Sequence, residues 1–195
     1  MKLAELEAKL SVQFPARYHE IYETGAMKWL EMTPEELKAN RMAYIADVSA
    51  FLMINCGCEP YLYDEIPAAM DDLRDLLSWT EKSGRKLRAD IRLIPFGHEN
   101  GDFYCFSYQG DGEPAVICIR HDAIAEEMAE EYGDFASFFY LQLMEAAENE
   151  EDIKGANYQA QVKYLSAEYA ARVDADALSD DYEDFPVTYA NIWAE

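Results

Sequence analysis

Two histidines and three carboxylates are expected to gather at one end of a predicted antiparallel meander: His98, Glu99, Asp102, His121 and Asp122. Imidazole and carboxylate groups ligate divalent metals, and a histidine beside a carboxylate can act as an acid–base pair. A metal-dependent enzyme using His98, Asp102 and His121 is therefore one hypothesis. Turn residues are also often polar simply because turns face water. The sequence has no nucleophile elbow, glycine-rich phosphate loop or His-Glu-x-x-His helix, so we predict no catalytic residue and no cofactor.

The four cysteines predict packed thiols rather than a metal site or a disulfide. Their positions, Cys56, Cys58, Cys105 and Cys118, match no paired Cys-x-x-Cys zinc pattern. Cys105 and Cys118 could meet across two strands, but a chain without a secretory signal favours reduced thiols. The sequence also has no long apolar run, so we expect a cytoplasmic protein with no membrane association.

The candidate ligands would be positioned by a three-stranded antiparallel meander at about 90–120. Its two turn signals are Asn100-Gly101 and Asp111-Gly112, dipeptides that accept positive φ. We expect both to form two-residue hairpin turns. Because such turns fix the register, they also decide which side chains meet across the strands.

This register predicts one apolar and one mixed face of the meander. It places Asp102 opposite His121 and Cys105 opposite Cys118. The apolar face should pack on helices and contains Ile91, Leu93, Tyr104, Phe106, Tyr108, Ala115, Ile117 and Ile119. The other face is expected to be partly open and contains Phe103, Cys105, Ser107, Cys118 and Arg120.

Helical spacing of apolar residues, together with capping residues, predicts helices along the rest of the chain. Thr33-Pro34-Glu35-Glu36 is typical of a helix start with a capping box. Asp134 is expected to cap a strongly apolar helix at the centre of the core. The predicted helices lie at about 3–10, 15–24, 34–47, 67–83, 124–132, 135–147 and 158–173, whereas 27–30 is expected to be extended and 48–55 fits either helix or strand.

The charge of the chain is strongly negative and uneven. The sequence has 39 acids and 16 bases, a net charge of −23, and most of the excess lies in residues 121–195. Such a surface repels phosphate backbones, so nucleic-acid binding is not expected. It would attract a basic protein, although solubility alone is an alternative explanation. One basic cluster is interpreted as helix-end charge and solvated loop: Lys82, Arg85, Lys86, Arg88 and Arg92.

Four short segments carry a family resemblance. Residues 10–18 read LSVQFPARY, residues 94–106 read IPFGHENGDFYCF, residues 115–122 read AVICIRHD, and residues 135–139 read FASFF. They resemble the opening helices, the strand pair with its Gly-Asp turn, the following strand and the "Ser-Phe-x-x-Phe" helix of the SUKH superfamily, also called the Smi/Knr type. The resemblance covers roughly residues 1–147 and implies no catalytic residues.

The resemblance implies an α+β domain with a mainly antiparallel sheet covered by helices. We therefore expect a SUKH-like domain at 1–147 and an acidic helical extension at 148–195, packed on it or linked to it. Bacterial members of the family resemble immunity proteins that neutralise a cognate toxin, often a nuclease. A basic toxin is accordingly the expected partner of a monomer or weak oligomer. A regulatory scaffold of the cell-wall-assembly type, docking through the extension, is the alternative.

The expected contact surface is the turn end of the meander together with the acidic segment that follows it. Carboxylates on such a surface would complement the basic groups with which a nuclease holds phosphate. The candidate partner-binding residues are Glu99, Asp102, Asp122, Glu126, Glu127, Glu130, Glu131 and Asp134.

Overall fold

The fold is a mixed α+β arrangement, as the sequence predicts. The computed structural model describes residues 1–46, 57–81, 84–149, 156–176 and 187–194. Its sheet has six antiparallel strands in chain order: β1 (Glu59–Pro60), β2 (Ile91–Glu99), β3 (Asp102–Gln109), β4 (Ala115–Ile119), β5 (Ala129–Gly133) and β6 (Thr188–Tyr189). The helices are α1 (Leu3–Leu10), α2 (Ala16–Glu23), the 3-10 helix η1 (Lys28–Glu31), α3 (Pro34–Ala46), α4 (Ile66–Glu81), α5 (Phe135–Asn149), α6 (Ala156–Val162) and α7 (Ala167–Asp176).

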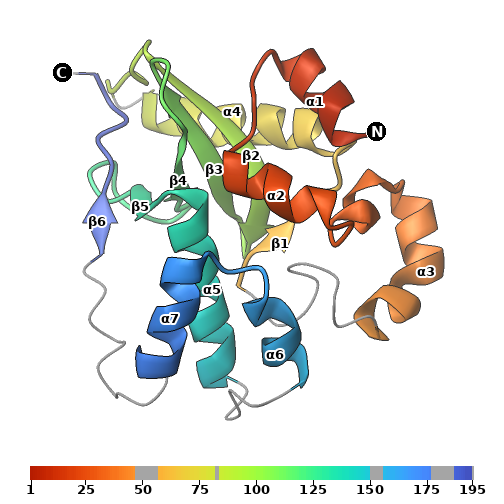
Figure 1. The fold of residues 1–195 in the computed structure, drawn as a ribbon. Helices are drawn as coiled ribbons and strands as arrows, with labels where there is room; N and C mark the ends of the chain where they lie inside the picture. Colours follow the sequence, from red (N-terminus) through yellow and green to blue (C-terminus); the bar gives the residue numbers. More distant parts are fainter. Residues whose placement is uncertain (47–56, 82–83, 150–155, 177–186, 195) are drawn as a thin grey trace.

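Helices cover both faces of the sheet (Figure 1). The larger core lies between one face and the helices α1, α2 and α5, and its centre is a group of touching aromatic rings: Phe14, Tyr18, Phe96, Phe106, Phe135 and Phe138. The smaller core lies on the opposite face, under α4 and the C-terminal segment. The expectation of a partly open second face is therefore wrong. Side chains that alternate along the central strands are buried on both faces. Helices α1, α2 and α5 cover one face, and α4 with the C-terminal segment covers the other.

The turn between β2 and β3 forms as predicted, but a bulge changes the register behind it. Asn100 and Gly101 have φ values of 49° and 99°, as a two-residue hairpin turn requires. The pairing then shifts by one residue between Pro95 and Gly97. This extra residue turns Leu93 and Ile91 to the smaller core, whereas the prediction placed them on the face of Tyr104 and Phe106.

The register between β3 and β4 also differs from the prediction by one residue. Tyr104 pairs with Cys118, and Cys105 pairs with Ile117. The predicted pair of Cys105 with Cys118 is therefore wrong. The reason is the connection, in which residues 110–114 replace the expected two-residue turn at Asp111-Gly112. A shift of one residue moves every β4 side chain to the other face, so Ile117 and Ile119 lie in the smaller core.

Two helices begin at capping residues that the sequence predicts, Thr33 and Asp134. The Thr33 capping box forms, with the Glu36 backbone N–H donating to Thr33 Oγ1 at 3.2 Å and the Thr33 N–H donating to Glu36 Oε2 at 2.8 Å. Asp134 caps α5 by accepting the Ser137 N–H at 2.8 Å. Helix α5 is central to the larger core, with Phe135, Phe138 and Phe139 buried. The ambiguous segment 48–55 lies outside the described residues.

Three predictions fail where tertiary contacts override local patterns. Residues 27–30, expected to be extended, are the N-cap and the first three residues of the 3-10 helix η1. The expected helix at 124–132 is instead a connection followed by β5, because this segment pairs with the free edge of β4. The expected helix at 158–173 is two helices, since Tyr164 and Leu165 turn into the larger core between α6 and α7.

The C-terminal segment, residues 187–194, closes the sheet and the smaller core. It pairs with β5 through β6, and Trp193 forms an isolated bridge with Leu87. Ile192 and Trp193 are buried, and Trp193 Nε1 donates a 2.8 Å hydrogen bond to the Ala125 carbonyl. Trp193 therefore docks the described part of the C-terminal extension on the domain, whereas Tyr189 is exposed.

Candidate functional site

The turn end of the meander holds a compact network around Asp102. This carboxylate is only 9% exposed. Its Oδ1 accepts the His121 backbone N–H at 2.9 Å and lies 2.6 Å from His121 Nδ1. Its Oδ2 lies 2.9 Å from Arg120 Nε, and the Arg120 guanidinium also reaches Glu130 Oε2 at 3.3 Å. Asp102 therefore ties the start of β3 to the end of β4 and, through Arg120, to β5.

The electrostatics of this network favour its charged form. Partial burial disfavours the Arg120 guanidinium, but the carboxylates of Asp102 and Glu130 outweigh that cost, so the pKa of Arg120 is raised above its ordinary value. Both oxygens of Asp102 are engaged by protein groups. The arrangement is therefore that of a structural ion-pair network.

The structure brings together only part of the predicted metal set. Ligand atoms of Asp102, His121 and Asp122 all lie within 4.8 Å of one another. His98 does not belong to this group, because its ring packs on Tyr61 with the centroids 4.7 Å apart. A metal ion could use Asp102 only by displacing its bonds to Arg120 or His121, so the geometry fits a metal centre poorly.

Five of the predicted partner-binding acids are engaged in contacts within the fold. Asp102 and Glu130 hold Arg120, and Glu126 forms an ion pair with Arg85. Glu99 Oε2 accepts the Tyr104 hydroxyl at 3.1 Å, and Asp134 caps α5. The sequence analysis assigned these five carboxylates to partner binding, and the structure shows that each already forms a contact within the protein.

The other three predicted acids are exposed, and no described residue forms an ion pair or side-chain hydrogen bond with their carboxylates: Asp122, Glu127 and Glu131. Three large apolar side chains are exposed in this segment and in the C-terminal segment that pairs with β5, namely Ile124 at 62%, Val187 at 57% and Tyr189 at 47%. β6 pairs Thr188 with Glu131 and Tyr189 with Glu130, so Glu131 and Tyr189 lie on neighbouring strands at this edge of the sheet and project to opposite sides of the strand pair. We call these six residues the β5–β6 edge.

The apolar half of the β5–β6 edge could not be found from the sequence. Val187 and Tyr189 are far from Glu131 along the chain and join it only because β6 pairs with β5. The sequence predicts an extension that is packed on the domain or linked to it, but it does not indicate which strand the extension pairs with.

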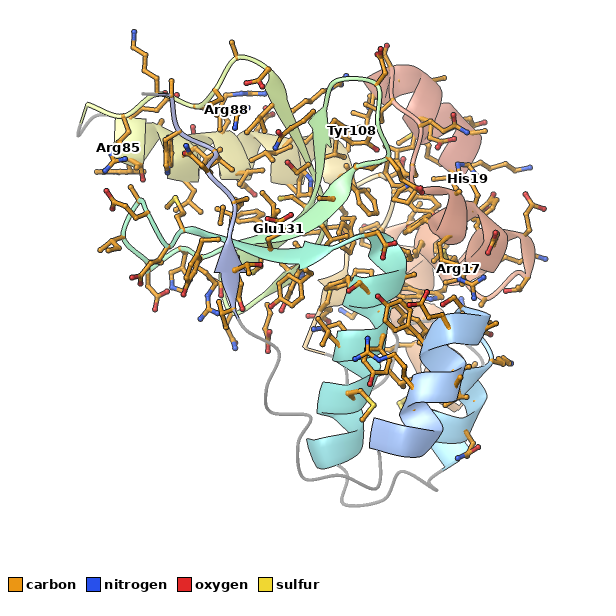
Figure 2. All side chains as sticks on the ribbon, turned by 60° about the vertical axis from the view of Figure 1, so that its left-hand side comes forward. Arg17, His19, Arg85, Arg88, Tyr108 and Glu131 are labelled. Atoms are coloured by element: carbon orange, nitrogen blue, oxygen red, sulfur yellow. The ribbon has the colours of Figure 1, made fainter. Side chains whose placement is uncertain are left out.

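The basic cluster is used inside the fold wherever the structure describes its contacts. Arg85 pairs with Glu126, and Arg92 donates to the Leu10 carbonyl. Arg88 pairs with Asp90 at 2.6 Å and donates to the Asn191 carbonyl at 3.0 Å, beside the C-terminal segment (Figure 2). These contacts support the interpretation of the cluster as helix-end and loop charge rather than as a binding patch.

The described cysteines are buried thiols that form no disulfide with one another. Cys58, Cys105 and Cys118 are unbridged, and Cys56 lies outside the described residues. Burial raises the pKa of the Cys105 thiol well above its ordinary value, and burial is also the main cause of the raised pKa of Cys118. A thiol that resists ionisation is a poor nucleophile and a poor metal ligand, so these groups serve packing.

Comparison with known families gives one match. A model of the SMI1 / KNR4 family (SUKH-1) matches residues 2–141. The match includes the central strands and the first half of α5, and it ends before α6, α7 and β6. Comparisons with curated proteins and with solved structures gave no match. In the part of the chain that the structure describes, no helix has the length and apolarity needed to span a bilayer.

Proposed function

Since this chain belongs to the SMI1 / KNR4 family (SUKH-1), we propose that it is a non-catalytic immunity protein that binds and occludes a basic, nuclease-type toxin. The family resemblance set out above implies this role for bacterial members. The network around Asp102 supports the non-catalytic part of the proposal, because its polar groups bind one another rather than facing an open cleft.

The observation that carries the proposal is the composition of the β5–β6 edge. Three of the five large apolar side chains that are exposed among the described residues lie there. The other three members of the edge are exposed carboxylates without a charged partner among the described residues. Apolar anchors surrounded by charge are typical of surfaces that bind proteins.

Electrostatics supply the expected partner class. A nuclease must present basic groups to hold phosphate, and this chain carries a net charge of −23. Opposite charges speed the encounter and favour a correctly oriented complex. An acidic protein that covers the phosphate-binding groups would block substrate without doing any chemistry.

Co-expression with nuclease toxin domains encoded beside this gene in its genome tests the proposal. The chain should restore growth, and the purified pair should bind with a measurable Kd. The variant Glu127→Lys/Glu131→Lys should weaken binding about tenfold or more, because two carboxylates of the edge become cations. If none of these toxin domains is bound or neutralised, the proposal is wrong.

A matched control separates local contact from total charge. The variant Glu20→Lys/Glu23→Lys makes the same charge change on α2, which covers the opposite face of the sheet from α4. It should change the Kd by no more than about threefold, through long-range screening-dependent effects alone. Equal losses in both variants would argue against the β5–β6 edge as the contact surface.

In the regulatory-scaffold alternative, the extension at 148–195 is the docking element. Ile192 and Trp193 are buried against the sheet of the same chain, so deleting residues 148–195 would remove core side chains as well as a docking element. Substitution of the exposed Val187 and Tyr189 by serine is the better test. A scaffold partner should be lost in this variant while the fold is kept.

A further inference from the structure

A cavity of about 510 Å³ lies between helix α3 and the edge strand β1. Lys38 and Arg41 line it from α3, whereas Glu59 lines it from β1 and His98 from the end of β2. Ligand pockets in proteins commonly have volumes of about 300–1,000 Å³. We call this space the α3–β1 cavity, and it is large enough for a small organic molecule.

The α3–β1 cavity has an apolar surface that belongs to the larger core. Trp29 and Leu62 line the cavity and are each only 3% exposed, and Leu37 packs against the same core. Pro60 adds a further apolar group from β1. Because the core holds these side chains in place, the surface is formed before any ligand arrives. An apolar ligand body that packs on it would be removed from water.

The bases of the cavity are unlike most bases of this protein. Lys38 and Arg41 are exposed, and no described residue forms an ion pair or a side-chain hydrogen bond with either. Each other arginine of the chain contacts a carboxylate, a backbone carbonyl or an aromatic ring within the fold: Arg17, Arg74, Arg85, Arg88, Arg92, Arg120 and Arg172. The two bases on α3 are therefore available to an anionic group in the cavity.

The opposite wall of the cavity carries a carboxylate. Glu59 is exposed, and no described residue pairs with its side chain. The other acid that lines the cavity, Glu65, accepts the Leu62 N–H at 3.1 Å. No described ion pair joins Glu59 to Lys38 or Arg41, so the oppositely charged walls face the cavity without contacting each other. A ligand with an anionic and a cationic end would engage both walls.

We propose that the α3–β1 cavity binds a small zwitterion with an apolar body, of the chemical class of apolar dipeptides with free ends. The ligand carboxylate binds Lys38 and Arg41, the ammonium group binds Glu59, and the ligand side chains pack on the apolar surface. A single α-amino acid carries both charges on one carbon, whereas a dipeptide separates them by a further residue and spans the gap between the walls. Binding is non-covalent throughout.

This site is separate from the surface proposed for the toxin. Strands β1 and β6 are the two opposite edges of the sheet. Figure 1 likewise shows α3 and β6 on opposite sides of the molecule. The binding of a small ligand beside β1 is therefore a further activity that does not depend on the immunity role.

Calorimetry with leucyl-phenylalanine tests the proposal. Wild-type protein should bind this dipeptide with a Kd on the order of 0.1–1 mM, as expected for a ligand of this size. Acetylation of its amino end and amidation of its carboxyl end should each weaken binding about tenfold, because each removes one charge. No heat of binding from the free dipeptide would overturn the proposal. An acetylated form that binds as tightly as the free form would also overturn it, because Glu59 would then have no role.

Variants of the two walls assign each end of the ligand. Lys38→Gln/Arg41→Gln should weaken binding of the free dipeptide about tenfold but that of the amidated form less than about twofold, because the amide has no carboxylate to lose. Glu59→Gln should likewise affect the free form but not the acetylated form. All three substituted side chains are exposed, so thermal melts should be unchanged.

A matched control separates the site from total charge. Lys9→Gln/Lys86→Gln removes two exposed bases that do not line the cavity, and it should weaken binding of the free dipeptide by less than about twofold. Equal losses in the cavity and control variants would overturn the proposal. Toxin binding should be the same in Lys38→Gln/Arg41→Gln as in wild type, so a failure of the immunity role would leave dipeptide binding intact.

Discussion

Gly97 lies in β2 directly against the edge strand β1, and no side chain fits there. A Cβ at this position would overlap the Cys58 sulfur and lie 3.1 Å from the backbone oxygen of Glu59. The clash involves backbone as well as a buried thiol, so it cannot be relieved by rotating one flexible side chain. Glycine here permits β1 to pair with β2.

The substitution Gly97→Ala should therefore destabilise the protein by about 1–3 kcal/mol, the usual cost of overpacking. Urea unfolding followed by tryptophan fluorescence measures this loss. The matched control is Gly112→Ala, because a Cβ there meets no atom within 4 Å. If the two variants were equally stable, the close approach of β1 would not constrain the fold.

Individual residues also show which features of the fold the sequence predicts and which it does not. The Asn100-Gly101 turn was predictable, because only a few residue types accept positive φ. The bulge beside Phe96 was not, because a bulge depends on how two strands meet rather than on the composition of either. The same limit applies to the candidate site. Asp102 and His121 lie together as the sequence predicts, but the sequence does not show that Asp102 also forms an ion pair with Arg120.

Helix α3 shows how an element can rest on its own local signals. Most of its described side chains are exposed, and it extends away from the sheet (Figure 1). Its start is fixed by the reciprocal bonds between Thr33 and Glu36. Elements of this kind are predictable from sequence, whereas β5 and β6 form only because the edge of a neighbouring strand is open to pairing.

Removing the Thr33 hydroxyl should loosen the start of α3. The variant Thr33→Ala should cost about 1 kcal/mol of local helix stability, because the Glu36 N–H loses its acceptor. Amide hydrogen exchange should become faster in the first turn of α3 and stay unchanged in β3 and β4. Thr33→Ser keeps the hydroxyl and should restore slow exchange. An unchanged rate in Thr33→Ala would show that the cap contributes nothing.

The molecule as a whole carries many tyrosines in and around its larger core. Burial, together with a hydrogen bond to Glu31, raises the pKa of Tyr22 from 10.0 to about 12. Burial likewise raises the pKa of Tyr18, Tyr63 and Tyr104 above the ordinary value. The folded state therefore holds these phenols neutral at a pH where the unfolded chain would ionise them.

Stability should consequently fall at alkaline pH. A phenol with a raised folded pKa contributes fully below the unfolded value of 10.0 and loses that contribution as the pH rises towards about 12. The free energy of unfolding should decline over this window, and phenolate absorbance should appear together with loss of the far-ultraviolet circular dichroism signal. Tyr22→Phe should flatten part of the decline. Phenolate absorbance that rises smoothly in a fully folded protein would contradict this expectation.

The bridge between Leu87 and Trp193 has a consequence for biosynthesis. A ribosome translates α4 and the first five strands well before residues 187–194, so the apolar surface beneath α4 stays uncovered while residues 134–186 emerge. A nascent chain that already contains the whole family-matched region still lacks Ile192 and Trp193. Chaperones that recognise exposed apolar surface would have their longest opportunity at this stage, and maturation would finish only when the strand that seals the sheet arrives.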